Sequence, residues 1–249
     1  MGARQKSEEF SGGFTIIEVI LFLAISGLLL AVAIASISAN INNSRFNDAV
    51  RATTSYLQGQ YNEVASGQND RPETTGCVNG TVTTTPTAKL GMTNCVVLGR
   101  YIKLQGDVFT VRYITGYRNT MQGISSDDVE AVKSMNPKVA AESVYSGNYD
   151  IPWGISLKNT TSSIGTYPAS GFAIIRSPAT GSILYYTIAN ESSPQPALLA
   201  SSLTEANLKK TATLCFQDST SSRTGRVIIG QGEGQEVIKT DLATTENCP

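Results

Sequence analysis

Apolar residues follow two different patterns in the N-terminal part of the chain. No residue from Val19 to Ile37 is charged, and about twenty apolar residues in a row are enough for a helix to cross a membrane. Farther on, apolar residues recur at spacings of four, seven, four and three, the period of an amphipathic helix. These residues are Phe46, Val50, Leu57, Tyr61 and Val64. We therefore predict one nearly continuous helix from Thr15 to Ala65, about 75 Å long.

The rest of the chain alternates between short β-type runs and turn residues. Two predicted hairpins have turns at Gln105-Gly106-Asp107 and at Pro178-Ala179-Thr180-Gly181. Their strands are Cys95–Leu104 with Val108–Thr115, and Gly171–Ser177 with Ser182–Ala189. Further predicted strands are Ile151–Leu157, Thr211–Phe216, Arg226–Gly230 and Glu236–Thr240. We predict short helices at Asp127–Ser134 and Gln195–Lys210 and an irregular loop over 66–94. The pattern between 119 and 149 is ambiguous outside Asp127–Ser134. One long helix followed by hairpins predicts an α+β fold in which the helix packs on an antiparallel β-sheet.

A short motif stands at the start of the apolar segment. Gly13 precedes Phe14, Glu18 follows four residues later, and the apolar run begins at once. These first fifty or so residues resemble the N-terminus of type IV pilins and of the pseudopilins of type II secretion. In that family a prepilin peptidase cuts after the glycine, here Gly13. The new N-terminal residue, here Phe14, is N-methylated, and the fifth residue of the mature chain is glutamate, here Glu18.

The resemblance gives Glu18 a role in assembly. Cleavage leaves an amino group on Phe14, which Glu18 of the same chain or of a neighbouring chain is able to neutralise. The family implies the second arrangement, in which this pair fixes the register of the filament. Opposite charges attract strongly where the dielectric constant is low, and an unpaired charge is costly there. The alternative is an acidic residue at the edge of a membrane, with no part in assembly.

The resemblance implies a structural protein rather than an enzyme: a subunit of a type IV pilus or related filament. Expected partners are the membrane before assembly, further copies or other pilins, a prepilin peptidase and methyltransferase, and an assembly platform protein. The expected location is the cytoplasmic membrane for the precursor and an extracellular filament or pseudopilus afterwards. The expected regions are a leader (1–13), a transmembrane or filament-core helix (14–40), an amphipathic helix (41–65) and an extracytoplasmic β-rich head (66–249).

Two alternatives stay open. One is a minor pseudopilin of a type II secretion-like system, because the strand with Cys215 and the run Arg226–Gly230 resemble the C-terminal part of the minor pseudopilin H family. The other is a membrane-anchored extracellular binding domain that does not polymerise. An ordinary secretory signal fits less well, since its apolar core is about 7–15 residues long and follows a basic region. Here the charges before the apolar segment cancel: Arg4, Lys6, Glu8 and Glu9.

Four cysteines in an exported domain predict two disulfides, with three possible connectivities. Proximity in the sequence favours Cys77–Cys95 and Cys215–Cys248, and the alternative is four unpaired thiols. The chain has no histidine and no CxxC pair, so we expect no metal site and no cofactor. Without histidine there is also no Ser-His-Asp or Cys-His arrangement, and we predict no catalytic residues.

The charges give little sign of a charged partner, because the net charge is -1 and only 16% of residues are charged. Four basic residues in or beside the first hairpin are interpreted as ordinary sheet surface, with a DNA-binding stripe as the alternative. They are Arg100, Lys103, Arg112 and Arg118. The acidic residues Asp127, Asp128 and Glu130 are interpreted as a helix start, which favours negative charge, rather than as a calcium site.

Overall fold

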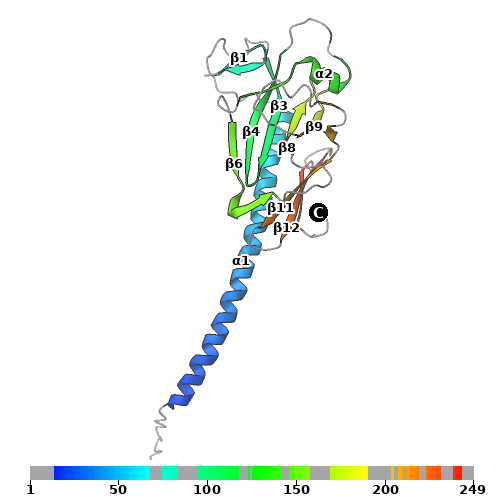
Figure 1. The fold of residues 1–249 in the computed structure, drawn as a ribbon. Coiled ribbons are helices and arrows are strands. Elements are labelled where there is room, and N and C mark those ends of the chain that lie inside the picture. The colour runs from blue at the N-terminus through cyan, green and yellow to red at the C-terminus, as the bar shows by residue number, and fades with distance from the viewer. Residues whose placement is uncertain are drawn as a thin grey trace, which may run out of the picture. The chain divides into compact units, whose positions relative to one another are not determined.

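In the computed structural model the chain forms two compact units, Met1–Arg45 and Phe46–Pro249. The residues that the structure describes are 14–67, 75–83, 95–117, 123, 125–141, 146–157, 169–189, 203–204, 207–209, 211–218, 223–230 and 238–242. Helix α1, Ile16–Ser66, contributes to both units (Figure 1). The predicted helix is thus confirmed to within one residue at each end.

The second unit contains the end of α1 and all the strands that the structure describes. The larger sheet has seven strands in the order β10-β9-β8-β3-β4-β5, and β6 also pairs with β4. Its strands are β3 (Cys95–Gln105), β4 (Val108–Tyr117), β5 (Lys138–Val139), β6 (Ser146–Asp150), β8 (Ala169–Arg176), β9 (Ile183–Ala189) and β10 (Leu208–Lys209). The smaller sheet has four strands in the order β13-β12-β11-β7. Its strands are β7 (Ile155–Leu157), β11 (Thr211–Asp218), β12 (Thr224–Gly230) and β13 (Ile238–Asp241).

Three smaller elements complete the unit. Strands β1 (Gly76–Val78) and β2 (Thr81–Thr83) form a hairpin of their own. Helix α2 covers Asp128–Ser134, and a 3₁₀ turn, η1, covers Pro152–Gly154. Every strand pairing in the described residues is antiparallel. The predicted α+β class with antiparallel sheets is confirmed, although two main sheets are present where the pattern predicted one.

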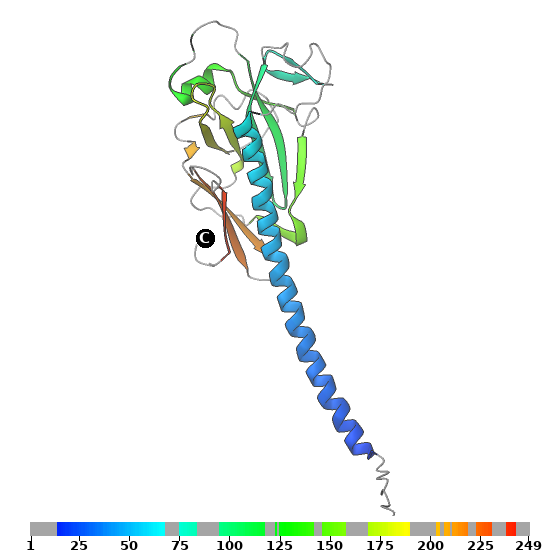
Figure 2. The same ribbon diagram turned by 180° about the vertical axis from the view of Figure 1, so that it is seen from behind.

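The main core lies where the last part of α1 meets both sheets. Figure 2 shows this part of the helix, in cyan, lying across the strands. Phe46, Val50, Leu57 and Val64 are buried there, and Tyr61 packs against them, so the predicted apolar stripe is confirmed. The larger sheet contributes Ile102, Phe109, Phe172 and Ile174, and the smaller sheet Leu214, Phe216, Val227 and Ile229. Each fully buried side chain of this size contributes about 1.5–3 kcal/mol.

Two polar residues on the same face of α1 were missed by the apolar pattern. Thr53 and Thr54 are buried, and their hydroxyls donate to the carbonyl oxygens of Ala49 (2.9 Å) and Val50 (2.8 Å). The Thr54 hydroxyl also lies 2.7 Å from that of Thr240 on β13. Because these hydroxyls have partners, their burial does not carry the cost of an unpaired polar group.

A second core cluster lies on the other face of the larger sheet. Val132 and Met135, from the region of α2, pack there with Tyr101, Ile114 and Tyr186. The predicted helix at Asp127–Ser134 is confirmed. Asp127 caps it by accepting a 2.9 Å hydrogen bond from the backbone N–H of Glu130. Burial raises the pKa of Tyr186 to about 12.

The structure corrects several predicted elements. The loop 66–94 contains the hairpin β1–β2, and β5 and β6 lie where no strand was predicted. The predicted strand Ile151–Leu157 is correct only for its last three residues, which form β7. Trp153 and Gly154 have positive φ angles of 65° and 68°, which interrupt the extended backbone. The helix Gln195–Lys210 is wrong at its end, since Leu208–Lys209 pairs with β9. Most of that predicted helix lies outside the described residues. The first two residues of the last predicted strand, Glu236 and Val237, also lie outside them.

One of the two predicted disulfides is confirmed. Cys77 of β1 is bonded to Cys95, the first residue of β3, at a sequence separation of 18. The bond fastens the β1–β2 hairpin to the larger sheet. Cys215 lies buried in β11 and is not a free thiol. Cys248 lies outside the described residues, so the Cys215–Cys248 pair stays a prediction.

Removal of this disulfide is expected to lower stability. For a closed loop of this size the chain-entropy argument gives about 3 kcal/mol. We expect the double variant Cys77→Ala with Cys95→Ala to lose that amount of unfolding free energy, measured by urea denaturation of the full chain in detergent. The double variant leaves Cys215 and Cys248 untouched, so the loss is assigned to one bond. Unchanged unfolding would show that β1–β2 is not constrained by it.

Candidate functional site

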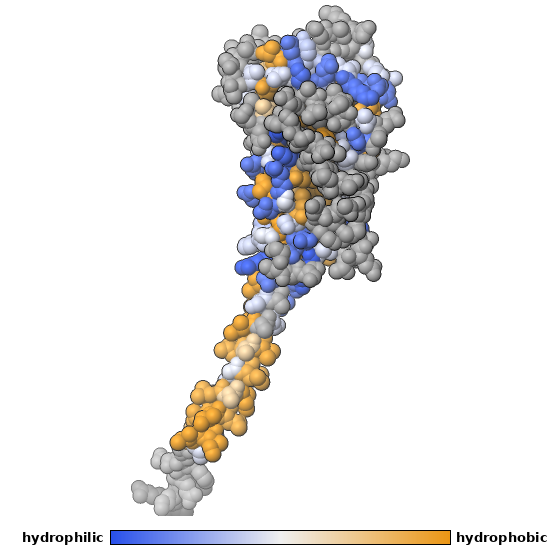
Figure 3. Space-filling view, viewed as in Figure 1, coloured by the Kyte–Doolittle hydropathy of each residue, from blue (hydrophilic) through white to orange (hydrophobic). Residues whose placement is uncertain are grey.

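The first unit presents an apolar surface on every side of its helix up to Ile37. The exposed large apolar side chains occupy nearly consecutive positions there, so α1 has no polar face between Val19 and Ile37. They are Phe14, Ile16, Ile17, Val19, Ile20, Leu21, Phe22, Leu23, Ile25, Leu28, Leu29, Leu30, Val32, Ile34, Ile37 and Ile41. Figure 3 shows apolar side chains, in orange, covering the visible face of this segment. A helix that is apolar all round is typical of one that other apolar groups enclose.

Such a segment needs lipid or protein around it. Its backbone hydrogen bonds are made within the helix, which is the condition for a segment inside a bilayer. The helix is long and apolar enough to cross a membrane, and a signal sequence near an N-terminus passes the same test. The segment is therefore consistent with a membrane anchor or a signal.

The first turn of α1 shows how Glu18 is held. Thr15 precedes the helix, and its hydroxyl accepts a 3.3 Å hydrogen bond from the backbone N–H of Glu18. The Thr15 carbonyl accepts a 3.1 Å bond from the N–H of Val19. Thr15 and Glu18 therefore have the spacing of a capping box, in which the glutamate stands at the third helical position. Glu18 and Phe14 are both exposed, and Gly13 lies outside the described residues.

This geometry leaves Glu18 with two distinct physical roles. A carboxylate in the first helical turn stabilises the helix by itself, because the free N–H groups there favour negative charge. The same carboxylate is accessible to a cation from outside the helix. Substitutions that separate the negative charge from the capping function therefore distinguish the two roles.

The predicted surface of basic residues on the first hairpin is wrong for two of its four members. Arg100 and Arg112 are both buried. Their partners across the strands are Tyr113 and Tyr101 respectively, so the two guanidinium groups lie on opposite faces of the sheet. The Arg100 guanidinium lies 3.8 Å from the Tyr113 ring centroid, and that of Arg112 lies 5.6 Å from the Tyr101 ring centroid. Arg100 and Arg112 therefore do not belong to one basic stripe on a single face of the sheet. Lys103 is half-buried, and Arg118 lies outside the described residues.

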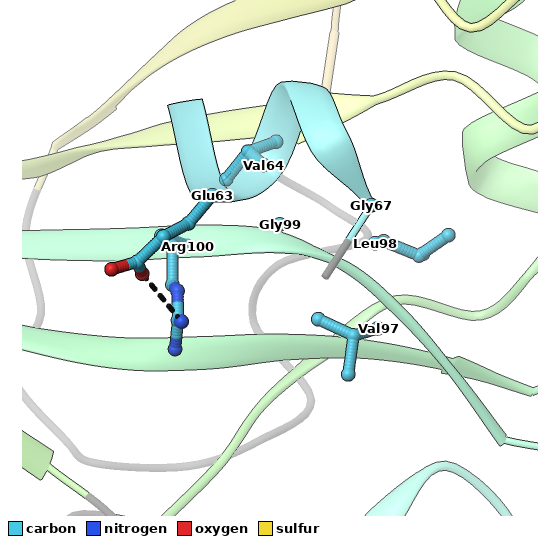
Figure 4. A pocket seen from close by; sticks show the side chains of 7 residues that line it. All are labelled: Glu63, Val64, Gly67, Val97, Leu98, Gly99 and Arg100. Atoms are coloured by element: carbon cyan, nitrogen blue, oxygen red, sulfur yellow. Dashed lines mark hydrogen bonds and ion pairs between the residues drawn. The ribbon is translucent and has the colours of Figure 1, made fainter. Parts of the chain in front are cut away.

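Glu63 near the end of α1 faces Arg100. Its Oε2 lies 2.7 Å from Nη2 of the arginine, as Figure 4 shows. These two residues line a small pocket with Val64, Gly67, Val97, Leu98 and Gly99. The cavity of about 10 Å³ has room for about one water molecule. The pocket is thus too small for an organic ligand.

The acidic residues around α2 serve the helix start, as predicted. The pKa of the Asp128 carboxyl is held below its ordinary value, chiefly by a hydrogen bond from the Ser177 side chain. Thr180 also donates to it, at 2.7 Å. In the described part of the chain, no group of three or more His, Cys, Asp or Glu residues is placed to hold a metal ion.

One exposed residue was missed by the sequence patterns. Trp153, the single tryptophan of the chain, has 59% of its surface exposed although it is large and apolar. The available signal was local: a tryptophan between Pro152 and Gly154 indicates a turn that displays the ring, rather than the middle of a strand.

Comparison of the chain with protein-family models, curated proteins and solved structures finds no match. Of the predicted assembly residues, the structure places Phe14 and Glu18 at the start of the exposed apolar helix.

Proposed function

We propose that this chain is a structural subunit of a type IV pilus or a related filament, processed at Gly13 and assembled through its N-terminal helix. The observation that carries the proposal is the combination of two features. The motif Gly13-Phe14 with Glu18 directly precedes the apolar segment, and that segment has no polar face. A folded unit with its own core and a disulfide follows it.

The physics of this arrangement favours assembly. An exposed apolar surface of this extent is stable only when lipid or other apolar side chains cover it. In a membrane the lipid covers it, and in a filament the helices of neighbouring subunits replace the lipid. Non-directional apolar contacts do not define how far one helix slides along another. A single charge pair between Glu18 and the Phe14 amine of another subunit supplies that register.

A minor pseudopilin of a secretion system is the second candidate. The observation that favours it is the hairpin of β11 and β12, which carries Cys215 opposite Arg226 and contains the run that resembles minor pseudopilin H. Both candidates share processing and helix-mediated assembly. They differ in abundance within isolated filaments.

Processing is the first prediction to test. We expect the chain, expressed with a prepilin peptidase, to begin at an N-methylated Phe14, as measured by intact-mass and N-terminal peptide mass spectrometry. A matched pair of variants locates the cut: Gly12→Val should still be processed, and Gly13→Val should remain full length. A mature protein that keeps Met1, or that begins after Ala33, would contradict the proposal in favour of an uncleaved anchor or a secretory signal.

A further inference from the structure

Trp153 is held in an unusual backbone conformation on a tight turn. Its φ and ψ angles are 65° and 21°, and Gly154 also has a positive φ. This left-handed conformation costs a non-glycine residue about 1–2 kcal/mol. Strained residues of this kind persist where their surroundings fix them, and they gather at functional sites.

The surroundings of the turn fix it firmly. Ile151 and Ile155, on either side, are buried in the main core. The N–H of Ile151 donates to the carbonyl of Asp107 at 2.8 Å, and the N–H of Ile155 donates to that of Pro152. The exposed ring is thus presented on a rigid support, so it loses little conformational entropy when it binds a partner.

Within the second unit, the turn at Trp153 lies at the same end as Phe46. Ile155 of β7 is paired with Asp218 of β11. Two residues before Asp218, Phe216 is paired with Gly225 of β12. A Cβ atom at Gly225 would lie 3.1 Å from the Phe46 ring. The turn that immediately precedes Ile155 is therefore at the Phe46 end.

Other large apolar side chains exposed in the described part of this unit lie elsewhere. They are Val78 and Val96, and each is next to a cysteine of the Cys77–Cys95 disulfide. Val96 is the second residue of the strand β3, whose far end, Gln105, precedes the turn at Gly106. The carbonyl oxygen of Gly106 accepts a hydrogen bond from the N–H of Leu157 at the end of β7. Gln105 lies nine residues along the strand from Val96, a distance of about 30 Å. Trp153 therefore stands apart from both valines.

Chain connectivity limits how far Phe46 lies from the apolar segment. Ile41 is the last exposed residue of the apolar segment, and Phe46 follows it by five residues. Even a fully extended chain of that length spans only about 18 Å. Whatever the arrangement of the two units, Phe46 therefore lies within that distance of Ile41.

We propose that Trp153 is an interfacial anchor, which seats its ring in the headgroup region of the lipid bilayer that the apolar helix crosses. Tryptophan favours this region because its ring is apolar while its N–H is polar. The anchor would hold the folded unit against the bilayer before assembly. This inference depends on the membrane-anchoring part of the proposed function, and it is independent of filament formation.

Nearby charges define the lipid that suits this contact. The exposed side chains of Asp107 and Asp150 flank the turn. Asp150 directly precedes Ile151, and the backbone carbonyl of Asp107 accepts a hydrogen bond from the N–H of Ile151. These carboxylates repel anionic headgroups at close range. A zwitterionic phosphatidylcholine bilayer is therefore the appropriate surface for a test.

Because Trp153 is the single tryptophan, its fluorescence reports this contact directly. The full chain is reconstituted in phosphatidylcholine vesicles with bromine on the acyl chains near the headgroups. We expect Trp153 to lose most of its emission relative to unbrominated vesicles, and to be protected from aqueous iodide. A matched control moves the only tryptophan to the other end of β3, by combining Trp153→Phe with Val96→Trp. The control should be quenched by iodide and insensitive to bromine.

Three outcomes overturn the anchor. If the chain floats with the vesicles but Trp153 is quenched by iodide and not by bromine, the anchor fails while membrane anchoring stands. If Trp153 is protected from both quenchers, another protein copy covers it instead of lipid. If the chain does not float with the vesicles, membrane anchoring fails together with the anchor.

Discussion

Replacing Glu18 with alanine is expected to abolish incorporation of the protein into filaments while its insertion into the membrane continues. Glu18 is exposed in the first turn of α1, and no residue from Val19 to Ile37 after it is charged. Inside a filament, the amine of a processed Phe14 would be left without an opposite charge, and breaking a buried pair costs about 3–5 kcal/mol. Sedimented filaments and the membrane fraction, compared by immunoblot, measure the two results.

Two further variants separate the charge of Glu18 from its capping role. Glu18→Gln keeps a side chain suited to the capping box but removes the negative charge, so we expect it to fail like alanine. Thr15→Ala removes the hydroxyl that accepts a hydrogen bond from the backbone N–H of Glu18, which costs the helix about 1 kcal/mol. This variant keeps the Glu18 carboxylate, so we expect it to assemble. Assembly of Glu18→Gln together with failure of Thr15→Ala would assign Glu18 a local structural role and contradict the register role.

The long helix was predictable because it depends on local patterns. An uncharged run followed by an apolar residue every three or four positions specifies a helix without knowledge of the fold. Burial of Phe46, Val50 and Leu57 followed from the same periodicity. The hairpins β3–β4 and β8–β9 were predictable for a similar reason, since their turn residues Gly106 and Gly181 have positive φ angles of 59° and 82°.

Elements that depend on distant partners were not predictable. Strand β6, Ser146–Asp150, has the sequence SGNYD, which contains no β-branched residue. It is a strand because β4 lies beside it, from Val108 opposite Asp150 to Arg112 opposite Ser146. Strand β10 has only two residues and forms against β9. Local propensity is weak in such positions, and tertiary pairing decides the conformation.

The candidate sites divide in the same way. The residues Gly13, Phe14 and Glu18 were singled out by the resemblance of a local motif to the N-terminus of type IV pilins, and their roles stay predictions. The burial of Arg100 depended on the register of β3 against β4 and on Glu63, which is 37 residues away in the sequence. Trp153 became a candidate only when the structure showed its exposure and backbone conformation together.

A methyl group added at Gly99 is expected to disrupt the larger sheet. Gly99 follows a β-bulge in β3 and is paired with Ile175 of β8. A Cβ atom there would overlap the carbonyl oxygen of Ile174 and would lie 2.9 Å from the Cα atom of Ile175. Both are backbone atoms, so the clash is relieved only by separating the two strands. We expect Gly99→Ala to lose about 3 kcal/mol or more of unfolding free energy.

Gly147 of β6 provides the matched control. It also lies in a strand of the larger sheet, and a Cβ atom there would meet nothing within 4 Å. Alanine costs less conformational entropy than glycine on folding, so Gly147→Ala should lie within about 1 kcal/mol of the wild type, on the stabilising side. Urea denaturation of the full chain in detergent, followed by far-ultraviolet circular dichroism, measures both variants. Equal stability of the two would mean that β3 and β8 do not approach each other at Gly99, and the central pairing of the larger sheet would then be wrong.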